Sequence, residues 1–214
     1  MEFAQSTLLW DEYDWYSVLW TDECYIWMGE NRGTVNVTRT KDEKLHPDCL
    51  VPRFAKKNSF MIWGGILGST GEKLLVIWEK KDWGSIRART YIDHILQPVI
   101  LPFLQRQSRP VIFMDDNAPA HTAQLTVKFK KDNLIHALNW PSGSPDLNPI
   151  ENIWNILKNR LQAREPRPVQ IEEIKKAVVE EWNAITVEEI RKCVDSMPDR
   201  IQAVVDNLGG HTRW

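Results

Sequence analysis

The amino-acid sequence predicts an α/β protein in which helices flank a mixed sheet and further helices follow at the C-terminal end. Three observations carry this prediction. Segments rich in β-branched and aromatic residues dominate the first third of the chain, helical spacing alternates with short apolar runs in the middle, and only helical patterns follow residue 165. At 214 residues the chain is long enough to bury a sizeable core.

Four strands are expected in the first part of the chain: 17–27, 34–38, 59–67 and 73–78. The first two would form a hairpin through the turn at 29–33, and Gly64-Gly65 predicts a kink in the third. Residues 40–58 are polar and contain two prolines, which is typical of an inserted loop.

Helices are expected where apolar residues recur every three or four positions. The first spans Ile92 to Leu104, and its Pro98 and Pro102 predict a kink or an early end. Later helices are expected at 122–131, from Pro149 onwards, and near 171–183, 187–195 and 198–208, the last closed by Gly209-Gly210. Two short strands and an irregular loop are expected between them, at 111–114, 134–138 and 139–148.

These elements divide the chain into three parts. Residues 1–16 are expected to be a linker or N-terminal segment, and residues 17–164 a catalytic-type α/β core with its inserted loop. Residues 165–214 would be a C-terminal helical extension, which starts at the linker candidate 165–169.

The composition is that of a soluble globular protein, with 43% hydrophobic and 26% charged residues. No apolar run approaches the roughly 18 residues of a membrane span, so no membrane partner is expected, and the N-terminal residues lack the basic region of a signal peptide. The three cysteines are widely spaced, which favours reduced thiols in an intracellular protein.

The net charge of −2 argues against a protein that binds nucleic acid over its whole surface. Residues 1–30 carry seven acidic and no basic residues, so the remainder carries a net charge of +5. The basic residues that would contact DNA if they converged on one face are Lys56, Lys57, Lys128, Lys158 and Arg160. Taken alone, each of their clusters is more typical of a solvated surface.

Two acidic positions follow expected strands. Asp22 follows the apolar first part of the strand 17–27. Burying a carboxylate there costs free energy unless it has a charged or hydrogen-bonding partner or a binding or catalytic role. Asp22 and Glu23 face opposite sides of the strand by alternation, and either of them would also suit a strand end in solvent. Asp116 follows 111–114, at the carboxyl end of a strand where ligands bind in α/β sheets, although Asp-Asn-Ala-Pro is also favourable turn chemistry.

The third acid, Glu151, begins a helix. Asn148 as N-cap, Pro149 as first helical residue and Glu151 as third resemble a capping box, so Glu151 has a local explanation as well as a chemical one. Lys158 lies two turns further along the same helix face and would meet a phosphate backbone beside the acids. His121 would assist protons or phosphates, or else cap or pack a helix.

Three motifs together resemble the catalytic domain of the mariner superfamily of transposases: Trp20 to Glu23 (WTDE), Phe113 to His121 (FMDDNAPAH) and Ser144 to Trp154 (SPDLNPIENIW). The resemblance implies a ribonuclease H-like fold over nearly the whole chain. It implies that Asp22, Asp116 and Glu151 form a metal-binding triad, because the family's second acid directly precedes Asn-Ala-Pro and the 34 residues between the second and third acids match one major branch. Asp115 would then be a bystander.

The resemblance further implies the chemistry. Two Mg²⁺ or Mn²⁺ ions would bind the triad, and hydrolysis that releases a strand end would be followed by attack of the freed 3′-OH on target DNA. The expected partners are double-stranded DNA, as transposon ends and as target, and a second copy of the chain in a homodimer on DNA. Nuclear residence is expected from this substrate.

Relatives in the superfamily carry a helix-turn-helix region ahead of the catalytic domain, and this region is expected to be absent here because the catalytic segment follows Met1 almost at once. Two alternatives to a working transposase therefore stand. One is a catalytically silent, transposase-derived DNA-binding or interaction protein, or an element relic. The other is a metal-dependent nuclease that does not join ends.

Overall fold

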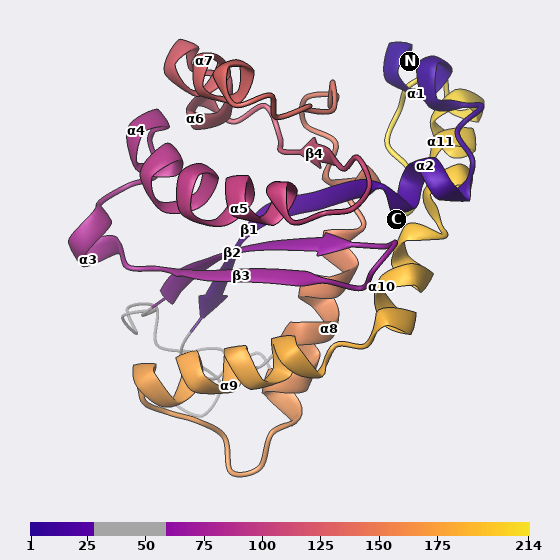
Figure 1. Cartoon of the computed structure of the whole chain (residues 1–214). Coiled ribbons are helices and arrows are strands. Elements are labelled where there is room, and N and C mark those ends of the chain that lie inside the picture. The colour runs from indigo at the N-terminus through magenta and orange to yellow at the C-terminus, as the bar shows by residue number, and fades with distance from the viewer. Residues whose placement is uncertain (28–58) are drawn as a thin grey trace, which may run out of the picture.

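A computed structural model describes residues 1–27 and 59–214. Its centre is a sheet of four strands: β1 (Val18–Trp27), β2 (Ser59–Leu67), β3 (Lys73–Trp78) and β4 (Ile112–Met114). The strands lie in the order β3-β2-β1-β4, with β1 antiparallel to β2 and parallel to β4, so the sheet is mixed as predicted (Figure 1). The predicted strand at 34–38, the predicted loop at 40–58, and Lys56 and Lys57 lie outside the described residues.

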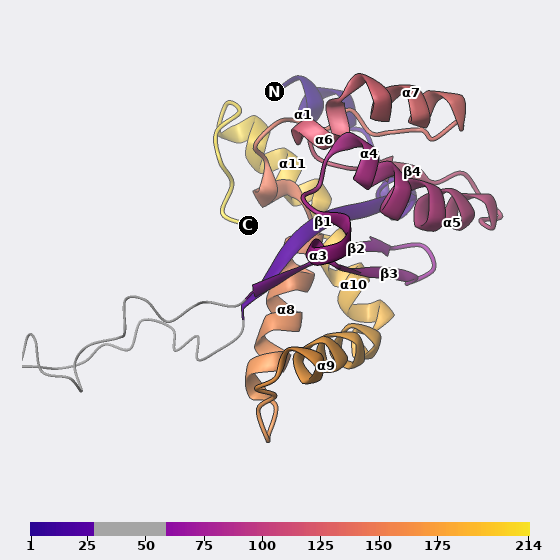
Figure 2. The ribbon, with the colours of Figure 1, turned by 90° about the vertical axis from the view of Figure 1, so that its left-hand side faces the viewer.

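One face of the sheet is covered by a helical layer in the middle of the sequence. Its members are α3 (Lys80–Trp83), α4 (Ala88–Tyr91), the π-helix Ile92–Ile100, α5 (Leu101–Gln105), α6 (Pro119–Thr122) and α7 (Gln124–Asp132) (Figures 1 and 2). Leu19, Trp63 and Phe113 point from the strands into this layer, where they meet buried apolar residues of the long helix. This packing forms the smaller of the two cores.

The opposite face is covered by α8 (Ile150–Ala163) and α9 (Ile171–Ala184), and the chain then continues to α10 (Val187–Val194), which packs on α8, and α11 (Met197–Asp206). These bounds agree with the predicted helices to within about two residues. Trp20, Ile62 and Met114 point from the sheet into the larger core, where Trp154 of α8 and Trp182 of α9 stack with ring centroids 5.0 Å apart. The residues after 165 therefore share a core with the sheet.

Gly64 and Gly65 do not kink β2, which continues from Ser59 to Leu67. The reason for Gly64 is close packing, because a Cβ there would lie 2.4 Å from the Trp154 ring. The Trp154 ring can therefore approach the backbone of the strand closely. The predicted kink does not interrupt β2, which stays paired with both neighbouring strands, and Gly64 reflects the approach of an indole.

The early end that Pro98 and Pro102 predicted for the first long helix was wrong. The helix runs through both prolines to Gln105, and Ile92–Ile100 adopts π-helical spacing. Pro98 has no N–H to donate and its ring would crowd the carbonyl of His94 in an α-helix, and the wider spacing accommodates it. The apolar face, from Ile92 to Phe103, stays buried along its length.

Other segments differ from expectation in extent. The strand expected at 134–138 is a single bridge, in which Phe113 pairs with Ala137. Residues 1–16 contain the short helices α1 (Glu2–Thr7) and α2 (Glu12–Tyr16), and α1 lies beside α11. The irregular loop contains one 3₁₀ turn, Pro145–Leu147. None of the described helices is long and apolar enough to cross a membrane.

Candidate active site

Asp22 lies in the middle of β1, where it faces α8. Its Oδ2 accepts a hydrogen bond from Trp154 Nε1 at 3.1 Å, and its register partner in β2 is Gly64, the residue that lets the indole approach. Burial raises the pKa of Asp22 to about 7, with the negative charges of Glu23 and Glu151 adding to the rise. Asp22 is therefore a partly buried carboxylate held close to other acids.

Glu151 lies in the first turn of α8, on the side facing Asp22. The predicted capping box between Asn148 and Glu151 does not form. The Glu151 carboxylate makes no hydrogen bond within the described part of the chain. Burial raises the pKa of Glu151, and the Lys158 ammonium opposes that rise. The capping-box explanation of Glu151 is therefore wrong, although an acid in the first turn still suits the helix dipole, and its carboxylate is available for chemistry.

Asn148, which the sequence suggested as an N-cap, makes such a bond to Ile150 and has a second task as well. Its side chain is buried, its Nδ2 donates to the backbone oxygen of Thr21 at 3.2 Å, and its Oδ1 accepts from the Ile150 N–H at 3.3 Å. The side chain thus joins the residue before Asp22 to the residue before Glu151. Sequence reasoning missed this functional position, and its place inside the Ser144–Trp154 motif was the only signal for it.

Asp22 and Glu151 together fit a divalent cation in donor chemistry. Both are hard oxygen ligands, which Mg²⁺ prefers. Each is partly buried and raised in pKa, and the charge of Glu151 contributes to the raised pKa of Asp22. Among the described residues, Lys158 is the one cation that affects the pKa of Glu151. A pair of carboxylates with so little compensation is stabilised by a bound cation.

Asp116 is turned away from this pair. The parallel register that sets Trp20 beside Met114 carries Asp22 and Asp116 towards the same end of the sheet. The Asp116 carboxylate, however, accepts from the Ala118 N–H at 2.8 Å and lies 2.7 Å from His121 Nδ1. Within the described ranges, no three His, Cys, Asp or Glu side chains are grouped so that they could hold a metal ion. Asp116 therefore bonds to Ala118 and His121 in this structure, and the metal-binding triad stays a prediction.

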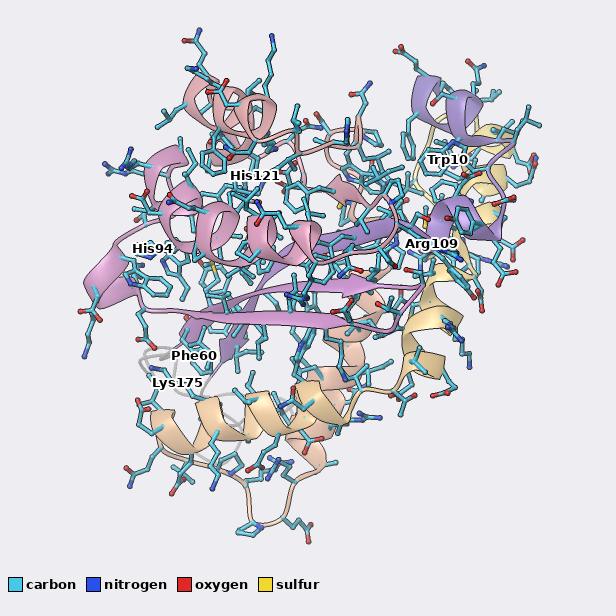
Figure 3. The ribbon with its side chains drawn as sticks, in the orientation of Figure 1. Trp10, Phe60, His94, Arg109, His121 and Lys175 are labelled. Carbon is cyan, nitrogen blue, oxygen red and sulfur yellow. The ribbon has the colours of Figure 1, made fainter. Side chains whose placement is uncertain are left out.

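His121 is buried, with 4% of its surface exposed, so its ring offers no surface to a DNA backbone. Its Nδ1 faces Asp116, its Nε2 lies 3.5 Å from Glu23, and its ring packs on Tyr91 within the helical layer (Figure 3). Burial lowers the pKa of His121, but the contacts with Asp116 and Glu23 outweigh burial and raise it to about 10. Glu23 faces the opposite side of β1 from Asp22, as alternation predicts.

Asp115 forms a separate buried ion pair. Its carboxylate bonds to Lys130, and the hydroxyl of Tyr91 lies 3.4 Å away. Both side chains are at most 10% exposed, so neither belongs to a solvent-facing surface. Asp115, which was expected to be a bystander to the metal-binding triad, thus forms a buried ion pair with Lys130.

Among the described residues, the basic side chains proposed for DNA contact do not converge. Lys128 lies on α7 and pairs with Asp132 at 2.7 Å, whereas Lys158 and Arg160 lie on α8 across the sheet (Figure 1). Arg160 pairs with Glu189 at 2.7 Å. Lys158 makes no ion pair with the described residues and, with Tyr25 and Arg167, lines a cavity of about 120 Å³. Of these candidates, Lys158 stands closest to the acids.

The chain matches the family model described as a DDE superfamily endonuclease over residues 55–175. It is 31% identical over 216 residues to the transposable element Tc1 transposase of Caenorhabditis elegans, covering 99% of this chain and 76% of that protein. It is 28% identical to the Tcb1 transposase of Caenorhabditis briggsae, again covering 76% of the relative.

Solved structures show the same fold. The catalytic domain of Mos1 mariner transposase superimposes with a TM-score of 0.69 at 19% identity, covering 99% of this chain and 93% of that chain. The Mos1 paired-end complex with the left transposon end gives 0.72 at 19% identity, and the paired end complex with Mg gives 0.68 at 20% identity. This chain spans 61% and 62% of the Mos1 chains in those two complexes.

The sheet order, the helices on both faces and these superpositions confirm the predicted ribonuclease H-like fold. The family match covers more than half of the chain, and the Tc1 relative aligns over nearly all of it. The chain therefore belongs to the DDE superfamily of endonucleases, as a transposase catalytic domain.

Proposed function

We propose that this chain carries out metal-dependent cleavage and strand transfer of DNA, with Asp22, Asp116 and Glu151 as its metal ligands. The observation that carries the proposal is the pair formed by Asp22 on β1 and Glu151 on α8, two partly buried carboxylates in which the charge of Glu151 adds to the raised pKa of Asp22. Membership of the DDE endonuclease family supports the same chemistry.

Asp22 and Glu151 would hold the metal, with Asp116 joining them after its carboxylate leaves His121. Two Mg²⁺ or Mn²⁺ ions, when bound, supply charge stabilisation at phosphorus and lower the pKa of the attacking water or 3′-OH. The Trp154 N–H keeps the Asp22 carboxylate directed towards α8. Lys158, two turns from Glu151, would contact a phosphate of the DNA backbone beside the reacting bond.

The proposed substrates are transposon-end DNA and target DNA, and the proposed assembly is a homodimer on DNA in the nucleus. Relatives support the first part, because Mos1 transposase has been crystallised in paired-end complexes with a transposon end and with Mg. Lys158 on α8 supports it independently, because its ammonium opposes the rise in the pKa of Glu151 and makes no ion pair with the described residues.

A second function rests on one observation. Asp116 is bound by His121 and by the Ala118 N–H, so the three carboxylates do not meet. A transposase-derived protein that binds DNA without cutting it would have this arrangement at all times. An active enzyme would have it only before metal and DNA bind.

A cleavage assay separates these functions. The purified chain is incubated with a labelled duplex in Mn²⁺, in Mg²⁺ and in EDTA, together with Glu151→Gln and the matched control Glu172→Gln. Glu172 is an exposed residue in the first turn of α9. We expect metal-dependent nicking by the wild type and the control, and a loss of at least about 100-fold in Glu151→Gln.

Joining of the released 3′-OH end to a second duplex then distinguishes a transposase from a simple nuclease. DNA binding without nicking, in a chain that folds normally, would favour the silent protein instead. Equal nicking by Glu151→Gln and the wild type would remove Glu151 from the site.

A further inference from the structure

Arg200 of α11 is a buried cation that makes no ion pair with the described residues. Its side chain is 1% exposed. Its three donor groups bond to neutral acceptors: Nε to Ser196 Oγ at 2.8 Å, Nη1 to the Asp146 backbone oxygen at 2.7 Å, and Nη2 to Asn152 Oδ1 at 2.6 Å. Burial lowers the pKa of Arg200.

Such a residue is costly for stability. Burying a charge without an opposite charge is unfavourable, and an apolar side chain of similar volume often stabilises a core as well or better. A guanidinium nevertheless fixes the geometry of its hydrogen bonds, because its N–H donors form a rigid, planar fork. The position of that fork is secured by its surroundings: the Trp214 ring lies 5.3 Å from Cζ, and Thr212 bonds to the Asp146 carboxylate.

The Arg200 guanidinium donates to residues at the start of α8. Asn152 directly follows Glu151, and Asp146 lies in the 3₁₀ turn that leads into the helix. On the other side of this turn, Asn148 bonds to Thr21, which directly precedes Asp22. The start of α8 is thus held between β1, through Asn148, and α11, through Arg200.

We infer that Arg200 is a positioning residue for Glu151: it fixes the first turn of α8 from α11 and so sets where the Glu151 carboxylate stands relative to Asp22. The inference rests on the proposed metal-dependent function. It makes the C-terminal helix a working part of the site, although α11 contributes no carboxylate to it. Shifts of supporting groups around metal ligands typically cost on the order of 10- to 100-fold in metal affinity or activity.

The test compares two ways of breaking this contact with a matched control. Arg200→Ala removes the fork, and Asn152→Ala removes its acceptor on α8 while leaving α11 unchanged. Arg200→Lys keeps the charge but loses the fork. The control is Arg191→Ala: Arg191 of α10 also donates to backbone oxygens, those of Gly68 and Ser69 at 3.2 Å, in the turn between β2 and β3.

Each variant is studied as the full chain at the same interval below its own melting temperature. Mn²⁺ binding is measured by calorimetry without DNA, and kcat and KM for duplex cleavage are measured separately. We expect Arg200→Ala and Asn152→Ala to weaken Mn²⁺ binding and lower kcat by roughly 10- to 100-fold with little change in KM. Arg200→Lys should fall between them and the wild type, and Arg191→Ala should match the wild type.

Two results would overturn the inference. One is equal Mn²⁺ binding by Arg200→Ala, Asn152→Ala and Arg191→Ala, which would make Arg200 a structural residue only. The other is a KM increase without loss of kcat or Mn²⁺ affinity. A folded wild-type chain that neither binds Mn²⁺ nor cleaves DNA would instead overturn the proposed function, and this outcome is recognised before any variant is compared.

Discussion

Gly64→Ala tests the contact that orients Asp22. A Cβ at residue 64 would lie 2.4 Å from Cη2 of Trp154 and 3.1 Å from Cη2 of Trp182. Carbon atoms pack at about 3.5–4.0 Å, so the Trp154 ring would have to move by roughly 1 Å. Its hydrogen bond to Asp22, now 3.1 Å long, would then exceed the length at which such bonds hold.

The magnitude follows from three contributions. Overpacking costs about 1–3 kcal/mol, loss of a hydrogen bond to a charged group costs about 1.5–3 kcal/mol, and the smaller entropy of an unfolded alanine returns about 0.4–1 kcal/mol. The expected loss of unfolding free energy is therefore about 1.5–5.5 kcal/mol. The pKa of Asp22 should also rise further, because the Trp154 donor now opposes the rise.

The assay is urea unfolding, with Gly65→Ala as the matched control. Gly65 is the next residue of the same strand, and a Cβ there would meet Thr21 at 3.3 Å and Leu19 at 3.4 Å, which small side-chain shifts relieve. We expect the control to stay within about 1 kcal/mol of the wild type. If Gly64→Ala were as stable as Gly65→Ala, the close approach of Trp154 would not be what this glycine provides.

Two further predictions concern buried charge. Because Asp22 holds its proton more tightly in the folded state, with a pKa of about 7 against 3.8, its contribution to stability is complete below about pH 4 and is lost as pH rises through 7. Asp22→Asn should therefore be more stable than the wild type at pH 8, by up to roughly 4 kcal/mol of unfolding free energy, and this advantage should disappear at pH 4. Urea unfolding at both pH values measures it, and a difference that does not change with pH would contradict the prediction. Lys130→Met should leave Asp115 buried without its cation and cost about 3–5 kcal/mol in thermal unfolding, while the neighbouring exposed Lys131→Met should cost little.

Short-range patterns predicted much of the fold. The alternation of β1, the apolar period of α8 and the C-terminal helices depend on neighbours within a few residues, and each lies close to its predicted bounds. The same logic placed Asp22 and Glu23 on opposite faces of β1. Local chemistry was incomplete at Asn148: its Oδ1 accepts from the nearby Ile150 N–H, but its Nδ2 donates to Thr21, a residue 127 positions away, and no capping box with Glu151 forms.

The different partners of Asp115 and Asp116 are a second feature that the sequence pattern could not predict. Both follow the same strand, and turn chemistry suits either of them. Lys130 pairs with Asp115 and His121 with Asp116, and the positions of these two partners depend on how α6 and α7 pack over the sheet. The sequence pattern alone could not assign either partner.

The sequence by itself determined the order and type of the main elements and, through its three motifs, the family to which the chain belongs. Only the tertiary structure decided that Asp22 and Glu151 stand together, that Asp116 turns to His121, and that α11 reaches the start of α8 through Arg200. Periodicity records which face of an element is apolar, whereas a hydrogen bond or ion pair between distant segments depends on where packing brings their side chains.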